Sequence, residues 1–141
     1  MTQPVFSIEG LDSTLFDASA WPLVYGRFPE LDEPDRVSRI LNSLDAILAL
    51  KQPFVVAWIP PSHDHDDEPH EDEKRSVMWI KQRKADLRQH CRGYLYITTD
   101  TALRALLEER LKTVNKMYGF PMRVVLSRQE AQEHLSKLMH P

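Results

Sequence analysis

The apolar residues of this chain follow two spacings, one typical of strands and one typical of helices. Residues 53–59, PFVVAWI, form a continuous apolar run, which predicts a strand covered on both faces. Residues 4–10 alternate between apolar and polar positions, and residues 23–25, 93–99 and 121–127 are further short β-prone runs. Residues 11–21 keep no clear period, so we treat them as a connection.

Four segments repeat their apolar residues every three or four positions, which predicts helices over residues 31–52, 73–91, 100–119 and 127–139. Pro34 fits the first turn of the first helix, and Asp100 is the expected N-cap of the third. Ser127 and Glu130 form a capping box for the last helix. The inward stripes are Val37, Ile40, Leu41, Leu44, Ile47 and Leu48; then Val77, Ile80, Leu87 and Cys91; then Leu103, Leu106, Leu107, Leu111 and Val114.

The resulting order is ββαβαβαβα, and alternation of this kind predicts an α/β fold with right-handed crossovers. We expect one α/β domain over residues 1–141, with a mainly parallel sheet of about five strands. Val55, Val56 and Ala57 should lie in its central strand, because that run is apolar on both faces.

Composition narrows the class of protein. The chain is 42% hydrophobic and 28% charged, with a formal net charge of −3, which argues against a dedicated nucleic-acid or anionic-membrane binder. Cys91 is the single cysteine, so an intrachain disulfide is impossible. Residues 1–10 lack the pattern of a signal peptide, and no apolar stretch approaches the ~20 residues that span a bilayer. These features predict a cytoplasmic domain without a membrane span.

Residues 61–73 form an acidic, histidine-rich segment with two readings. His63 and His65 are two positions apart, so on an extended segment both rings project to one side, and His70 adds a third nitrogen. With an aspartate oxygen these would make a zinc- or nickel-like mixed site. The alternative is a solvated acidic loop that holds no metal in its default state. We favour the loop, because closing it around an ion costs conformational entropy.

A basic surface follows this segment. Lys81, Lys84, Arg88 and Arg92 recur at three- and four-residue steps, so on one helix they would share a face that could meet RNA, an acidic partner or the chain's own loop. Tyr94 and Tyr96 could stack on bases, although an exposed amphipathic helix is the better interpretation.

Catalytic signatures are weak by comparison. The sequence has no nucleophile-elbow motif and no phosphate-cradling glycine loop, and we interpret Cys91 as a small core residue. We therefore predict no catalytic residue and no cofactor-binding residue.

In element order and length the chain resembles the SpoIIAA-like branch of the STAS fold. The stretches WPLVYGRFPE, KQPFVVAWIP, HCRGYLYITTDTALRALLEERL and FPMRVVLSRQEAQEHL stand where those domains carry strand, strand, strand–helix and strand–helix. The family's phosphorylated serine would fall within residues 60–77, where Ser62 and Ser76 are available, but its Asp-Ser pair and glycine are absent. The resemblance implies protein contacts in regulation, and SEC14-type relatives imply lipid binding.

Three functions follow from these patterns. The first is a non-enzymatic, cytoplasmic STAS-like domain that acts through protein–protein contacts in regulation. The second is a divalent-metal protein that uses His63, His65 and His70. The third is a small-molecule or lipid-binding domain. The identity of a protein partner and the formation of a homodimer are left open by the sequence.

The loop interpretation predicts the effect of removing the histidines. Replacing His63, His65 and His70 together with alanine should leave the melting temperature nearly unchanged in metal-free buffer, because no packed structure would depend on them. Any metal affinity, measured by calorimetric titration, should fade below about pH 6 as the imidazoles protonate. A large loss of thermal stability, or a stoichiometric ion that survives chelation, would instead establish a structural metal site.

Overall fold

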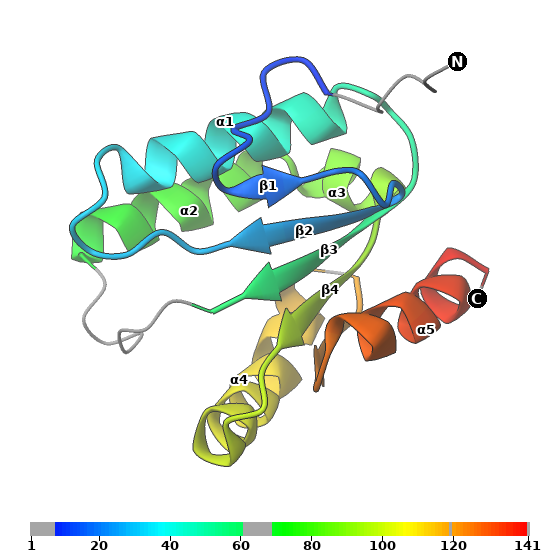
Figure 1. Cartoon of the computed structure of the whole chain (residues 1–141). Coiled ribbons are helices and arrows are strands. Elements are labelled where there is room, and N and C mark those ends of the chain that lie inside the picture. The colour runs from blue at the N-terminus through cyan, green and yellow to red at the C-terminus, as the bar shows by residue number, and fades with distance from the viewer. Residues whose placement is uncertain (1–7, 61–68, 119, 141) are drawn as a thin grey trace.

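The computed structural model describes residues 8–60, 69–118 and 120–140, without the side chains of residues 114–118. These residues form five strands and five helices in the order β1-β2-α1-β3-α2-α3-β4-α4-β5-α5 (Figure 1). The strands are β1 (Phe16–Asp17), β2 (Leu23–Arg27), β3 (Phe54–Ile59), β4 (Cys91–Ile97) and β5 (Met122–Val125). The helices are α1 (Arg36–Leu48), α2 (His70–Gln82), α3 (Lys84–His90), α4 (Thr101–Tyr118) and α5 (Arg128–Met139).

The strands form one sheet in the order β1-β2-β3-β4-β5, with β1 antiparallel and the other four parallel. The prediction of an α/β fold with a mainly parallel sheet of five strands is confirmed. β3 is the central strand, and its residues from Phe54 to Trp58 are all buried. The apolar run of residues 53–59 thus occupies the position that its sequence predicted.

Alternate residues of β3 face two separate apolar clusters, one on each side of the sheet. Phe54, Val56 and Trp58 belong to the larger cluster, to which α1, α2, α3 and α4 contribute. Val55 and Ala57 belong to the smaller cluster, which is closed by α5. Figure 1 shows this arrangement, with α1, α2 and α3 on one side of the sheet and α5 on the other. The sheet is therefore covered on both faces.

The N-terminal strand differs from the prediction. Residues 4–7 lie outside the described residues, and Ile8 to Gly10 form a turn in which Gly10 has a φ of +86°. The first strand is instead the two-residue β1, inside the segment that was expected to be a connection. Phe16 and Asp17 pair with Gly26 and Tyr25, so the pairing partner rather than the local pattern defines this strand.

Helix α1 begins later than predicted. Asp35 has a left-handed backbone with a φ of 51°, so Pro34 precedes the helix and does not form its first turn. The predicted stripe is confirmed toward its C-terminal half, where Leu44, Ile47 and Leu48 are buried.

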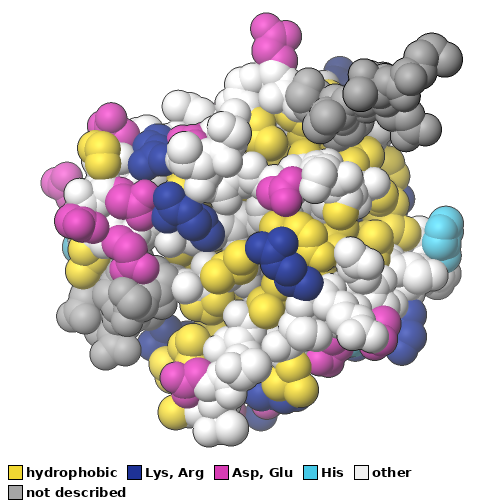
Figure 2. Space-filling view, viewed as in Figure 1, with side chains coloured by type: hydrophobic (Ala, Val, Ile, Leu, Met, Phe, Trp, Pro, Cys, Tyr) yellow, Lys and Arg dark blue, Asp and Glu magenta, His cyan; other side chains and the backbone are white. Residues whose placement is uncertain are grey.

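A buried arginine connects the starts of α1 and α2. The Arg36 guanidinium lies 3.3 Å from an Asp72 carboxylate oxygen and donates to the backbone carbonyl of Pro29. Acidic residues surround this junction, from residues 32–35 before α1 and from Glu71 to Glu73 in the first turn of α2. Figure 2 shows Asp and Glu side chains gathered at its left edge, over these two helix starts. Carboxylates here are favoured by the positive ends of the helix dipoles.

The single helix expected over residues 73–91 is two helices, and residues 70–72 belong to the first of them rather than to the loop. The break is at Arg83, whose guanidinium pairs with the Asp45 carboxylate of α1 and lies over the Trp79 ring. Trp79 Nε1 also donates to Asp45 at 3.1 Å. After the break Cys91 opens β4, and Val77, expected to face inward, is 40% exposed while Trp79 is buried.

Helix α4 is less buried than its leucine stripe predicts. Over residues 101–113 Leu111 is the one buried residue, and Leu106 is 45% exposed. The helix packs against the edge strand β5 rather than against the middle of the sheet. Part of its apolar surface therefore extends beyond the sheet and stays exposed. The predicted Asp100 cap is confirmed, since its carboxylate accepts from the N–H groups of Ala102 and Leu103.

The capping box of α5 is confirmed with one shift of partner. The Ser127 hydroxyl accepts from the Glu130 N–H at 3.1 Å, as the motif requires. The Glu130 carboxylate accepts from the Leu126 N–H, one residue before the usual position.

Truncation of Leu44 should destabilise the domain. Leu44 is 5% exposed in the larger cluster, so Leu44→Ala should lower the free energy of unfolding by about 2–5 kcal/mol through lost burial and a cavity. Leu106→Ala is the matched control on a half-exposed leucine and should cost much less. Urea denaturation of both variants measures the difference, and a Leu44→Ala cost below about 1 kcal/mol would show that α1 is poorly packed.

Candidate functional site

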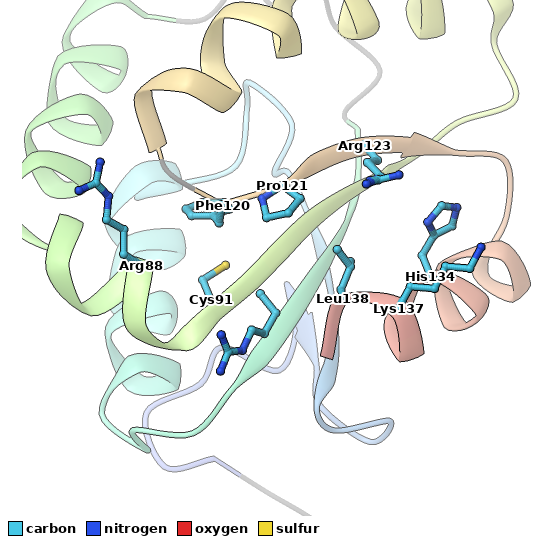
Figure 3. A pocket seen from close by; sticks show the side chains of 9 residues that line it. Arg88, Cys91, Phe120, Pro121, Arg123, His134, Lys137 and Leu138 are labelled. Carbon is cyan, nitrogen blue, oxygen red and sulfur yellow. The ribbon is translucent and has the colours of Figure 1, made fainter. Parts of the chain in front are cut away.

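A hollow of about 330 Å³ opens where α3, α5 and the amino ends of β4 and β5 meet (Figure 3). Five of its lining residues precede or begin strands: Cys91 and Arg92 open β4, Phe120 and Pro121 lead into β5, and Arg123 is the second residue of β5. The complete lining, here called the basic cleft, is Arg88 of α3; Cys91 and Arg92; Phe120, Pro121 and Arg123; and His134, Lys137 and Leu138 of α5.

Cationic side chains surround the basic cleft. Arg88, Arg92, Arg123 and Lys137 come from four different elements, and no aspartate or glutamate is among its described lining residues. In Figure 3 Arg88 lies on one side and Lys137 on the other, with Phe120 and Pro121 between them. A carboxylate lies at its border, where Glu130 is 3.8 Å from His134 Nε2. The cleft is thus a local concentration of positive charge.

The base of the cleft is apolar and closely packed. Cys91, Phe120 and Leu138 are buried, and the Phe120 ring meets Tyr94 edge to face at 4.9 Å between centroids. Gly93 lies beneath this wall, and a Cβ there would be 3.1 Å from both a Leu138 methyl and the Pro121 carbonyl oxygen. A side chain at this position would therefore require Leu138 or the Pro121 backbone to move away by a few tenths of an ångström.

Helix α5 is fixed at both ends, which positions its cleft residues. Near its start the Arg128 guanidinium stacks on the Tyr25 ring at 4.4 Å, and Gln132 donates to the Tyr25 hydroxyl. Near its end Leu138 packs over Gly93. His134 and Lys137 lie between these anchors, so the helix presents them to the cleft from a supported backbone.

Arg92 stands at an irregularity of the sheet. The pairing of β3 with β4 joins Phe54 to Cys91 but Val55 to Gly93, so Arg92 is the extra residue of a bulge. A bulge can redirect a side chain that regular alternation would point elsewhere. The Arg92 Nε atom is buried and has no hydrogen-bond partner among the described residues. Its charged group is consequently only partly hydrated.

The cysteine of the cleft is a buried, protonated thiol. Burial raises the pKa of the Cys91 thiol to about 12, and its Sγ lies 3.7 Å from the Gly93 carbonyl oxygen. The interpretation of Cys91 as a small core residue is consistent with this burial, although it lies in a strand and not on a helix.

The predicted basic face is divided among several elements. Lys81 is in α2, Lys84 and Arg88 are in α3 and Arg92 is in β4, so the four do not form one helical surface. Of these, Arg88 and Arg92 line the cleft.

The remaining cleft residues were missed because no sequence spacing joins α3, β4, β5 and α5. The three-residue step from His134 to Lys137 was the available signal. Stacking of Tyr94 on bases is contradicted, since its ring is buried against Trp58 and Phe120.

The histidine segment is only partly within the described residues. His63, His65 and Ser62 lie outside them, whereas His70 is exposed as the first residue of α2. Within residues 8–60, 69–118 and 120–140 no group of three or more histidine, cysteine, aspartate or glutamate residues is arranged to hold a metal ion. The metal site stays a prediction. Ser76 is half-buried in α2 and donates to the Asp72 carbonyl oxygen at 3.0 Å.

No family model matches the chain, and neither the curated proteins nor the solved structures include a match. The resemblance to SpoIIAA-like domains therefore stays a prediction. Among the helices of the described ranges, none combines the length and the apolar character needed to cross a membrane.

The burial of Cys91 predicts its reactivity. At pH 8 a thiol with a pKa of about 12 is thiolate to about one part in ten thousand, so the folded chain should react very slowly with Ellman's reagent. The chain unfolded in guanidinium chloride should react fully within minutes, and a Lys84→Cys variant should provide a fast exposed thiol on the same folded background. Rapid, stoichiometric labelling of Cys91 in the native chain would mean that the base of the cleft opens readily.

Proposed function

We propose that this chain is a non-enzymatic binding domain for a small anionic ligand, which it holds in the basic cleft. The observation that carries the proposal is that Arg88, Arg92, Arg123 and Lys137, from four different elements, line one hollow that no described carboxylate lines. Clefts of one charge sign with apolar walls concentrate the electric field and attract counter-ions.

The pairing of other arginines supports this function by contrast. Glu33 accepts from Arg27 at 2.8 Å, and Asp12 accepts from Arg39 at the same distance. The hydrogen bond from Arg39 is the largest of the interactions that lower the pKa of Asp12 to about 2, so this carboxylate is ionised and paired with Arg39 at neutral pH. By comparison, the four cleft cations have no ion pair among the described residues. An anion from solution would supply the missing counter-charge.

The size and the chemistry of the cleft favour binding over catalysis. A volume of about 330 Å³ is at the lower end of the ~300–1,000 Å³ typical of small-molecule sites. Its thiol is protonated and buried, and its arginine and lysine side chains are cations suited to holding an oxyanion. This choice corresponds to the third function derived from the sequence. Regulation through a protein partner and metal binding by the histidine segment stay predictions.

Removal of one cleft cation should weaken the binding of inorganic phosphate. Arg92→Gln, Arg123→Gln and Lys137→Gln should each raise the Kd about tenfold, because a hydrogen bond to a charged group contributes about 1.5–3 kcal/mol. Lys84→Gln removes the same charge from an exposed position on α3 outside the cleft, and it should change the Kd less than about twofold. Backbone amide shifts in a phosphate titration at low ionic strength measure both effects.

The same titration can contradict the proposal. Shift changes should cluster on residues 88–93, 120–123 and 134–138. Shifts spread evenly over the surface, or an equal loss of affinity for Lys84→Gln and Arg92→Gln, would indicate non-specific screening rather than a site.

A further inference from the structure

The cleft also restricts the chemical class of its ligand, and this inference rests on the proposed function. We infer that the ligand is a free organic phosphate monoester with an apolar substituent: the phosphate lies among Arg92, Arg123 and Lys137, and the substituent lies against Phe120, Pro121 and Leu138.

The charge of the cleft favours a doubly charged group. Four permanent cations line it and no described carboxylate offsets them, so a single carboxylate would leave most of their mutual repulsion in place. A phosphate monoester carries about two negative charges above pH 7 and offers three acceptor oxygens. Arginine side chains match that geometry with paired N–H donors. The dianion therefore neutralises more of the cleft than a monoanion of similar size.

Arg92 is the expected centre of this contact. It is the extra residue of the bulge at the start of β4, and it lines the cleft together with Arg88 of α3 and with residues of α5. Its Nε atom is shielded from water and has no described partner, and its charge is therefore less well hydrated than that of an exposed arginine. A partly dehydrated guanidinium gains more from an anionic partner, because less water must be displaced and the local dielectric is lower.

The apolar wall accounts for the second part of the ligand. Pro121 presents exposed hydrocarbon surface, and Phe120 and Leu138, which are 5% and 8% exposed, close the wall behind it. Figure 3 shows Phe120 and Pro121 between the flanking cations. A bare inorganic ion would leave this surface in contact with water, whereas an apolar substituent would cover it. The volume of about 330 Å³ leaves room for a compact substituent and not for a dinucleotide.

Three probes separate the contributions of charge and apolar contact. Phenyl phosphate, methyl phosphate and benzoate are titrated by calorimetry into the full chain at pH 8, where both phosphates are dianions. Phenyl phosphate should bind about tenfold more tightly than methyl phosphate, which lacks the ring, and about tenfold more tightly than benzoate, which lacks the second charge. Arg123→Gln and Lys137→Gln should reduce the preference for phenyl phosphate over benzoate, whereas Lys84→Gln should preserve it.

The outcomes distinguish this inference from the proposed function. If none of these probes and no inorganic phosphate binds, both fail. If inorganic phosphate binds in the cleft but phenyl phosphate and methyl phosphate bind equally, or benzoate equals phenyl phosphate, the ligand class is wrong and the anion site stands. Phosphatidylcholine vesicles containing phosphatidic acid test the lipid source of the same headgroup. Binding to those vesicles without binding to phenyl phosphate would overturn the inference of a free ligand.

Discussion

The fold depends on the burial of strand β3 on both faces. Its alternate residues belong to two apolar clusters, so helices are required on each side of the sheet. Among the described helices, four share the larger face and α5 closes the smaller one. Because the basic cleft lies where α5 meets the entries of β4 and β5, its position is a consequence of this unequal covering. A sheet with one exposed face would have no such junction.

The formal net charge of −3 conceals a division of charge over the surface. Carboxylates gather at the starts of α1 and α2, at the carboxyl ends of β2 and β3, where Arg36 and the helix dipoles stabilise them. The cleft cations lie instead at the amino ends of β4 and β5. An argument from net charge against anion binding is therefore valid for the molecule as a whole and misleading for the cleft.

The sequence was informative where one element determines its own environment. The apolar run of β3, the stripe of α1 around Leu44 and the caps at Asp100 and Ser127 depend on neighbours within a few positions, and each is present. Prediction from the sequence failed where the local structure depends on residues far away in the chain. The break at Arg83 requires Asp45, 38 positions away, and the two residues of β1 are defined by β2. The cleft was missed for the same reason. A bulge at Arg92 and the approach of α5 to Gly93 do not change the spacing of apolar and polar residues in the sequence.

The shallow packing of α4 has a consequence for the dynamics of the cleft. With Leu111 as the buried residue of its first 13 positions, this helix should open at a lower free energy than α1 or β3, and its amide hydrogens should exchange earlier. Phe120 follows α4 closely in sequence and forms part of the base of the cleft. Local unfolding of α4 would loosen that ring before the sheet is disturbed. A sparsely buried helix thus leads directly into the basic cleft.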